Sequence, residues 1–343
     1  MSDFLLNLVE RDCKLAGFKS DKQIILNGLA PLFVEYKHSN SVNLIKASLL
    51  EKAKFQNWQE KSQTIFKLFD NSGIRFLVFK GFALTHCVYQ NSYIRPYSDI
   101  DMIVDVEDYK MAEQLLSENG FSKVSSREGQ FVSFQNSFYD NDSPQCVIDL
   151  HWQINNRIEF HKNFPFGYLY KHSNTINQDD SQFHVLSSVD GFVLSCFHFQ
   201  AHRPEDRKHI WLYDLALMWN QMSDVEKQTC IEKAKATSQY KVVSSCLHLV
   251  NQVFGKLYNL DGFIVENNFE DTELYLGERK RKATDIKIRL KNIDGFSNKI
   301  KYLSEYIFQS RDYVKNRYQL KTTNWIWLYY PRMWVEDFLK LFK

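Results

Sequence analysis

Hydrophobic positions along the first 70 residues recur at the three- and four-residue spacing of an amphipathic helix. Ile65, Phe66 and Phe69 form one such stripe, directly before Asn71-Ser72-Gly73, a combination typical of a helix end. The spacing therefore predicts an N-terminal helical region over residues 1–70.

Short apolar runs replace this helical spacing after residue 73. Ile74–Phe79 (IRFLVF) predicts a buried strand that ends at Lys80-Gly81, and a helix is expected from Phe82 to about Tyr89. Asp99–Val104 (DIDMIV) predicts a second strand. The region beginning at residue 71 is therefore expected to contain a sheet.

Three more elements are predicted in the same region. Asp105 is placed to cap a helix that runs to Asn119, where Gly120 would end it. Phe131–Phe134 and Val147–Trp152 predict two strands, antiparallel to each other because a turn-rich segment separates them.

Helical spacing is expected again from about residue 155 to the end, most clearly over Gly191–Asn220. The whole pattern predicts an α/β (α+β) fold with three parts. A small mixed-sheet core over residues 71–155 would be flanked by the N-terminal helical region, 1–70, and a C-terminal helical domain, 156–343.

Composition narrows the class of protein. Only 12 Gly and 6 Pro in 343 residues favour long helices over a turn-rich all-β fold. The net charge of +2 does not indicate a nucleic acid partner. The six cysteines are scattered without a C-x-x-C pair, so a disulfide framework or a zinc site is not indicated. Acidic residues near the start and the absence of an 18-residue apolar run predict a cytoplasmic protein.

Carboxylates on the predicted strands suggest a metal site. Asp99 and Asp101 are two residues apart, and such side chains point to the same face of a strand. Asp149 lies in the run Val147–Leu150 and would add a third carboxylate if that run pairs beside the first. Carboxylates suit Mg²⁺ or Mn²⁺, and a pair of such ions can assist phosphoryl displacement. A solvated strand edge is the alternative for a D-x-D pattern alone.

Basic and imidazole groups accompany these acids. Gly81, at the start of a helix, lets backbone amides approach a phosphate, and Lys80 beside it can pair with a phosphate or a carboxylate. Arg95 suits a triphosphate, or else forms an ion pair with Asp99 or Asp101. His151 shares a strand face with Asp149 and can contact a nucleotide, move a proton or be purely structural.

These residues occur in an order and spacing that resembles a known family. The strings are Lys80-Gly81-x-x-Leu84, Tyr93-x-Arg95-x-x-x-Asp99-Ile100-Asp101 and Ile148-Asp149-Leu150-His151-Trp152. Over roughly residues 30–220 the chain resembles the bacterial uncharacterised nucleotidyltransferases of the polymerase beta-like superfamily.

The resemblance implies roles for individual residues. It makes Asp99 and Asp101 the first two metal ligands, Asp149 the third, and Gly81 the glycine of the phosphate loop. The superfamily usually has Gly-Ser or Gly-Gly at this loop, whereas this chain has Lys80-Gly81-Phe82. Lys80 would therefore substitute for the missing serine.

The resemblance also implies an activity. The chain would move a nucleoside monophosphate from a nucleoside triphosphate, the substrate, to an acceptor and release pyrophosphate. The acceptor is open among a sugar, a metabolite, a peptide, a protein and RNA, and nucleic acid is not specifically indicated. A catalytically inactive nucleotide- or partner-binding module of the same fold is the alternative, and a metal-dependent phosphohydrolase is a third reading.

Three features outside the predicted core remain. His198 and His202 are four apart on a predicted helix without the H-E-x-x-H pattern of a zinc protease. The segment from His202 to Asp214 resembles the family's downstream helical motif, which would close over the nucleotide. Residues 279–291 are strongly basic and favour a solvated surface over a polyanion contact. The aromatic stretch Trp325–Phe342 favours packing on the helical domain over peripheral membrane contact.

Overall fold

The computed structural model describes Val9 and residues 18–124, 127, 129–143, 145–155, 158–178, 181–202, 204–254, 282–320 and 325–339. The helix expected before residue 18 lies outside this set, apart from Val9. So do residues 279–281 of the basic segment and the end of the aromatic stretch after residue 339. Two compact units divide the chain, Met1–Asp101 with Leu169–Glu278 and Met102–Tyr168 with Arg279–Lys343.

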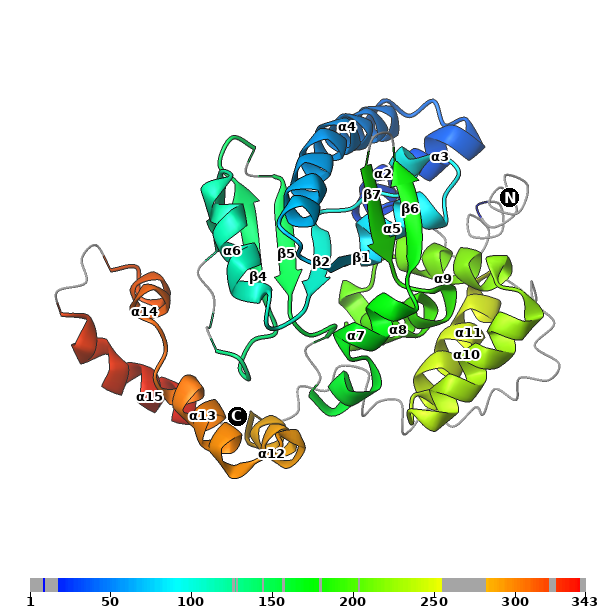
Figure 1. The fold of residues 1–343 in the computed structure, drawn as a ribbon. Helices are drawn as coiled ribbons and strands as arrows, with labels where there is room; N and C mark the ends of the chain where they lie inside the picture. Colours follow the sequence, from blue (N-terminus) through cyan, green and yellow to red (C-terminus); the bar gives the residue numbers. More distant parts are fainter. Residues whose placement is uncertain are drawn as a thin grey trace. The chain divides into compact units, whose positions relative to one another are not determined.

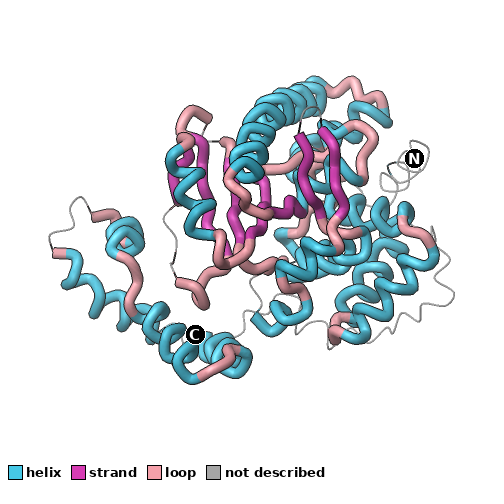
Figure 2. The backbone as a smooth tube through the Cα atoms, in the orientation of Figure 1, coloured by secondary structure: helices cyan, strands magenta, loops and turns pink. Residues whose placement is uncertain are grey.

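The seven strands form one mixed sheet in the order β3-β4-β5-β2-β1-β7-β6, drawn in magenta in Figure 2. Together with the flanking helices it confirms the predicted α/β (α+β) class. The predicted three-part division, 1–70, 71–155 and 156–343, stays a prediction, because the two compact units divide the chain at other points.

The first unit contains an N-terminal helical layer, a part of the sheet and a group of later helices. Its elements are α2 (Asp21–Leu26), α3 (Ala30–Lys37), α4 (Val42–Asn71), β1 (Phe76–Phe79), α5 (Lys80–Cys87), η1 (Ser92–Ile94), β6 (Asn174–Gln178), β7 (Ser181–Val185), α8 (Ser188–Ala201), η3 (Pro204–Asp206), α9 (Ile210–Gln221), α10 (Asp224–Ala236) and α11 (Tyr240–Phe254).

Helix α4, 30 residues long, packs on β7 and is drawn above it in Figure 1. The contact is aromatic: Phe66 lies with its ring centroid 5.3 Å from Phe76 of β1, 5.9 Å from Phe82 of α5 and 5.0 Å from Phe183 of β7. All four side chains are buried. This cluster fixes the β1–α5 junction against the rest of the unit, since a close-packed core resists displacement.

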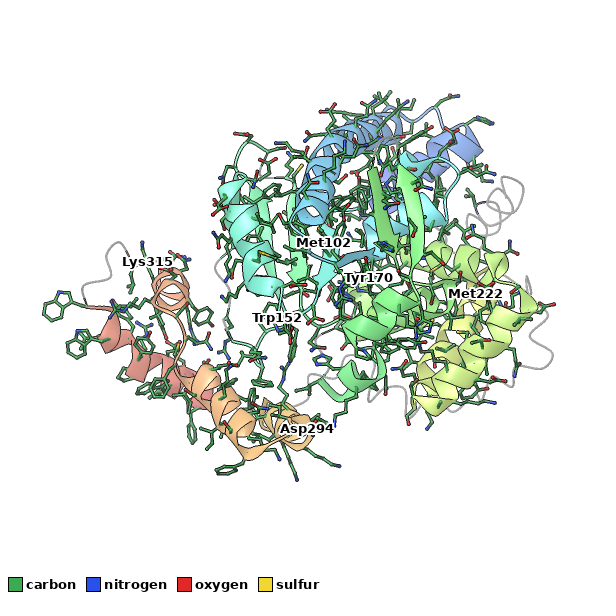
Figure 3. The ribbon with its side chains drawn as sticks, in the orientation of Figure 1. Met102, Trp152, Tyr170, Met222, Asp294 and Lys315 are labelled. Carbon is green, nitrogen blue, oxygen red and sulfur yellow. The ribbon has the colours of Figure 1, made fainter. Side chains whose placement is uncertain are left out.

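Helix α8 contacts α9, α10 and α11, which are grouped in Figure 1. Ser223 begins α10 with a capping box, in which its hydroxyl accepts from the amide of Glu226 and the Glu226 carboxylate accepts in return. Met222, labelled in Figure 3, is the C-cap residue directly after α9. The capping box satisfies backbone donors at the start of α10, which would otherwise lack partners.

The second unit contains an antiparallel meander and the C-terminal helices. Its elements are α6 (Tyr109–Glu118), β3 (Phe121–Lys123), β4 (Gln135–Asp140), β5 (Val147–His151), η2 (Ile158–Asn163), α12 (Lys282–Asn292), α13 (Phe296–Ile307), α14 (Arg311–Arg317), η5 (Ile326–Leu328) and α15 (Tyr329–Leu339). Two elements cross the division between the units: β2 (Ile100–Val104) and α7 (Phe166–Lys171).

Strands β4 and β5 pair as predicted for two antiparallel strands, with Ser137 opposite Asp149. The first of them begins at Gln135, so the expected strand Phe131–Phe134 was placed too early. Trp152 directly after β5, labelled in Figure 3, packs its ring 4.5 Å from that of Tyr109 on α6. Aromatic pairing of this kind adds to the burial that holds a helix on a sheet.

Two other predictions need correction. Helix α6 begins after Asp108, and the Asp105 carboxylate instead accepts from the amide of Glu107 in the preceding turn. The expectation of helices alone beyond residue 155 is wrong, because β6 and β7 form a hairpin and β7 pairs in parallel with β1 at Val78↔Val185.

The C-terminal helices are held by ion pairs and carry exposed aromatic groups. Asp337 of α15 pairs with Arg127 at 2.6 Å and with Arg317 of α14 at 3.1 Å. Trp334 and Phe338 remain exposed, at 39% and 58%. None of the described helices combines the length and apolar composition that crossing a bilayer requires. Peripheral membrane contact through this segment and a cytoplasmic location stay predictions.

Candidate active site

The backbone is unusual where β1 meets α5. Phe79 ends the strand in an extended conformation, and Lys80 follows with φ of 55°, in the left-handed region. That conformation costs a residue with a Cβ roughly 1–2 kcal/mol. Such strain persists only where the surrounding structure imposes it, and it is concentrated at functional positions. The sequence showed the Lys-Gly step but gave no sign that lysine, and not glycine, takes the left-handed conformation.

Lys80 is bound to a buried carboxylate. Its Nζ lies 2.6 Å from Oδ1 of Asp101, whose side chain is only 5% exposed. A buried carboxylate needs a compensating cation, and the ammonium supplies one. Asp99 is half-buried and precedes β2, so it lies next to the strand and not inside it as predicted.

Gly81 leaves room for an arginine. A Cβ built on Gly81 would lie 2.5 Å from Nη1 of Arg95 and 3.0 Å from Cβ of Tyr97. Real Cβ atoms essentially never approach other atoms this closely, so the contact with Arg95 explains the glycine. The role of Gly81 in phosphate binding stays a prediction beside this packing role.

Arg95 is buried and its guanidinium is paired with Asp214 of α9. Nε and Nη2 donate to the two oxygens of that carboxylate at 3.2 and 2.7 Å, and Nη1 donates to the carbonyl of Pro96. Burial lowers the pKa of Arg95, but the charge and hydrogen bonds of Asp214, together with the nearby Tyr89 and Asp99, outweigh burial, and the pKa is raised. The alternative foreseen for this residue, an ion pair with Asp99 or Asp101, is therefore corrected to a pair with Asp214.

Tyr89, two residues after the end of α5, completes this buried cluster. Its hydroxyl donates to Oδ1 of Asp214 at 2.7 Å, and burial, followed by the Asp214 charge, raises the pKa of the phenol. Oδ1 of Asp214 therefore accepts from Tyr89 and Arg95, and Oδ2 accepts from Arg95. The cluster links α9 to the loop that carries Asp99, so Asp214 orients the groups beside the carboxylates and does not itself need to touch a substrate.

A cavity of about 490 Å³ opens beside Lys80, within the size range of small-molecule sites. Every residue around it belongs to the first unit, and its walls come from α2, α4, α5, the loop before β2, α8 and α9. Three lysines lie on these walls, Lys54, Lys80 and Lys208. Arg95 and five acids, Glu51, Asp99, Asp101, Asp206 and Asp214, line it as well, so the cavity carries charges of both signs.

Three rings form one wall of the cavity. His198 of α8, His202 at the end of α8 and Trp211 of α9 have pairwise centroid distances of 4.7, 4.7 and 4.8 Å. Burial, followed by the charge of Lys80, lowers the pKa of His198 to about 3 and also lowers that of His202. His198 is therefore uncharged at neutral pH. The sequence singled out the two histidines by their spacing and Trp211 only as part of a longer motif.

Asp149 of β5 is held by its neighbours on β4. Gln135 Nε2 donates to Oδ2 at 2.9 Å and Ser137 Oγ donates to Oδ1 at 2.5 Å. Asp101, Asp149 and His151 each offer a ligand atom, and these atoms lie within 4.8 Å of one another. Two carboxylates and an imidazole form a donor set that fits a divalent cation such as Mn²⁺, Mg²⁺ or Zn²⁺.

The comparison with protein families decides the class. The family model described as "Uncharacterised nucleotidyltransferase" matches residues 36–255, more than half of the chain. The chain belongs to this nucleotidyltransferase family. The resemblance and the enzyme class predicted from the sequence are thereby confirmed. The matched range includes the β1–α5 junction, β2 and β5. It also includes helices α8 and α9, which contribute to the cavity walls.

Three solved structures are also similar to this nucleotidyltransferase. The lincomycin-bound lincosamide antibiotic adenylyltransferase LnuA is 15% identical, with coverage of 46% of this chain and 94% of that one and a TM-score of 0.34. The antibiotic-resistance factor ANT(2'')-Ia is 11% identical, with coverage of 57% of this chain and 98% of that one and a TM-score of 0.39. An antigenic nucleotidyltransferase-like protein from Paracoccidioides brasiliensis is 16% identical, with coverage of 55% of this chain and 91% of that one and a TM-score of 0.34. No curated protein matches the sequence. The family assignment rests on the family match.

Proposed function

We propose that this chain transfers a nucleoside monophosphate from a nucleoside triphosphate to an acceptor hydroxyl with the help of Mg²⁺ or Mn²⁺. The acceptor oxygen forms a bond to the α-phosphorus, the bond from that phosphorus to its bridging oxygen breaks, and pyrophosphate leaves. The observation that carries the proposal is the buried Asp101, which belongs both to the metal-ligand group and to the cavity wall.

Asp101 and Asp149 would hold the cation, with Asp99 beside them and His151 as a further ligand or a nucleotide contact. A cation bound there would neutralise charge that develops on the phosphates during transfer. Asp149 would in addition accept the proton of the attacking hydroxyl, since a carboxylate can act as a general base at short range. The donor set of Asp101, Asp149 and His151 supports these roles.

Lys80 would bind the triphosphate in this proposal. Its ammonium faces a cavity that also carries Lys54 and Lys208, and the amide of Gly81 follows directly at the start of α5. Arg95 would act on the phosphates through its charge, because its donors are held by Asp214 and Pro96. His202 would contact the nucleotide from the end of α8.

One observation favours the alternative, a binding module without turnover. The Lys80 ammonium contacts an oxygen of Asp101, which a metal ion would also need. A site that has lost its metal could keep lysine in place of the cation. In an active enzyme, metal binding must instead release Lys80 from Asp101 and leave it to the phosphates.

The deciding experiment incubates the protein with each labelled ribonucleoside triphosphate, Mg²⁺ or Mn²⁺ and a cell extract. Labelled product together with pyrophosphate is expected, whereas orthophosphate would indicate a phosphohydrolase. Asp101→Asn should abolish product without unfolding the protein, because the amide keeps the shape and loses the charge that binds the cation. Asp105→Asn, just after the same strand, is the matched control and should behave as the wild type. Normal turnover by Asp101→Asn would refute the metal-site assignment.

A further inference from the structure

The ring wall of the cavity has a composition that neither the carboxylates nor the lysines explain. His198, His202 and Trp211 come from two helices, meet at centroid distances below 5 Å and stay half-buried. Rings in a closed core would be covered on all sides, as the neighbouring Tyr213 and Trp219 of α9 are. The three rings instead border the cavity.

The wall is apolar in character although it lies near a cation. Burial keeps the pKa of His198 at about 3, so that its imidazole carries no charge at neutral pH. Neutral imidazole and indole rings offer flat π-faces that pack well against other aromatic rings in offset-stacked or edge-to-face arrangements. A planar ligand ring can stack against such faces without a need for a specific hydrogen bond.

Lys80 lines the same cavity as the three rings. After burial, its charge is the next cause that lowers the pKa of both His198 and His202. Ile25, Leu26 and Ile210 add further apolar surface to the same cavity. The cavity thus combines a flat apolar part with lysines and acids on its other walls. A planar ring joined to phosphates, with a divalent cation between the phosphates and the acids, fits this combination.

We propose that the wall of His198, His202 and Trp211 binds the base of the nucleoside triphosphate by stacking, with Trp211 as the main contact. This inference rests on the proposed function, which it deepens by assigning the base to one surface of the cavity. Stacking surfaces accept every base, so the wall fixes the position of the base and does not select adenine over the other bases.

The test separates binding of the base from binding of the phosphates. Calorimetric titrations in Mg²⁺ compare ATP, GTP, CTP and UTP with inorganic tripolyphosphate, which has the phosphates and no base. At least one nucleotide should bind the wild type about tenfold more tightly than tripolyphosphate, a difference of about 1.4 kcal/mol. Trp211→Leu should remove this advantage and leave the affinity for tripolyphosphate unchanged.

Three further variants make the result specific. Trp211→Phe keeps an aromatic face and should retain most of the nucleotide affinity. Lys80→Ala should weaken nucleotides and tripolyphosphate alike, because it removes a phosphate contact. Trp327→Leu removes an exposed tryptophan of the other unit, 60% exposed, and should behave as the wild type.

Three results would overturn the inference. The Trp211→Leu protein could bind nucleotides as the wild type does, it could lose affinity for nucleotides and tripolyphosphate equally, or the wild type could bind no nucleotide. A different result would refute the proposed function. If the protein binds nucleotides through Trp211 but forms no product, base stacking on the wall is supported and nucleotidyl transfer is refuted. Normal turnover with unchanged affinity in Trp211→Leu refutes the wall alone.

Discussion

Lys80 combines two properties that seldom occur in one residue, a left-handed backbone and a side chain bound to a buried acid. Glycine adopts this backbone at no steric cost, and an alanine pays for it in full. The two properties can therefore be separated by substitution, because both Lys80→Gly and Lys80→Ala remove the ammonium while only the first relieves the backbone.

Lys80→Gly is expected to be more stable than Lys80→Ala by about 1 kcal/mol, because a Cβ in the left-handed region costs roughly that amount. Both variants should lose nucleotide affinity equally, since both lack the ammonium. Denaturant unfolding and nucleotide titration measure the two effects. Equal stability of the two variants would show that the left-handed conformation of Lys80 is not maintained. Lys80→Arg should restore affinity poorly, because a planar guanidinium does not replace a compact ammonium.

His86 of α5 makes the fold sensitive to acid. Its ring lies among Phe55, Phe82 and Phe183, and burial lowers its pKa from 6.5 to about 4. The unfolded chain therefore takes up a proton at higher pH than the native protein does. The contribution of His86 to stability is full above pH 6.5, is lost as the pH falls toward 4 and changes no further below it, and this loss is up to about 3 kcal/mol.

His86→Phe should remove this part of the acid sensitivity. The melting temperature of the variant, measured from pH 7 to pH 4.5, should fall less than that of the wild type. Part of the fall should remain, because burial lowers the pKa of His161 and His198 in the same direction. His172→Phe, at an exposed position, is the control and should leave the slope unchanged. A slope for His86→Phe equal to that of the wild type would contradict the assignment.

At the scale of single residues, the local spacing of the sequence predicted some site residues and missed the partners of others. Asp101 and Lys80 were both singled out from the strand and the Lys-Gly step. The partner of Arg95 was not, because Asp214 is 119 residues away and no local pattern links the two. A buried ion pair is a property of the folded chain, and a single sequence shows only that an arginine and an acid exist.

At the scale of elements, the junction of β1 and α5 depends on the absence of a side chain at Gly81. Gly81→Ala should lower the free energy of unfolding by about 1–3 kcal/mol, the usual cost of overpacking. The clash falls on Arg95, which cannot move away easily because Asp214 holds its guanidinium on two sides. Chemical denaturation measures the effect.

Gly167→Ala is the matched control for that substitution. Gly167 lies in α7, and a Cβ there would meet no atom within 4 Å. Alanine in a helix is favoured over glycine by up to about 1 kcal/mol, so this variant should be as stable as the wild type or more so. If Gly81→Ala and Gly167→Ala unfold at the same denaturant concentration, the close contact between Gly81 and Arg95 does not matter for stability.

Elements with a strong local pattern were predictable, and the hairpin of β6 and β7 was not. Strands β1 and β2 are buried along their whole length, and Asp101 is the one residue in them that is not apolar. The sequence showed both strands within two residues of their bounds. Strand β6 is largely exposed and polar, and β7 shows only Phe183 and Val185 as buried apolar residues. Five residues with so little alternation do not distinguish a strand from a loop until a partner such as β1 is known.

At the scale of the whole molecule, most residues that line the cavity lie within the part of the chain that the family model matches. The match ends at residue 255, so the C-terminal helices α12 to α15 lie outside it, whereas most of the cavity lies inside it. Of the residues that line the cavity, only Ile25 and Leu26 of α2 and Gly28, just after α2, lie outside the matched range. Ligand binding should therefore stabilise Met1–Asp101 with Leu169–Glu278, the unit that forms these walls.

Mg²⁺ together with a nucleoside triphosphate should raise the melting temperature, because a ligand that binds only the native state stabilises it by mass action. The gain is about 2.7 kcal/mol when the ligand concentration is a hundred times Kd. Mg²⁺ alone should give a smaller shift, since Asp101, Asp149 and His151 leave its coordination shell incomplete without phosphate oxygens. Differential scanning fluorimetry with the four common ribonucleotides measures both effects.

The same measurement on variants tells binding at this cavity from binding elsewhere. Asp101→Asn should lose the additional shift that Mg²⁺ gives to the nucleotide, while Trp211→Leu should reduce the shift with nucleotide and keep the one with tripolyphosphate. Trp327→Leu should show both shifts at full size. No shift with any of the four nucleotides at saturating concentration would refute nucleotide binding, and equal shifts in the wild type and in all three variants would place the binding site outside the cavity.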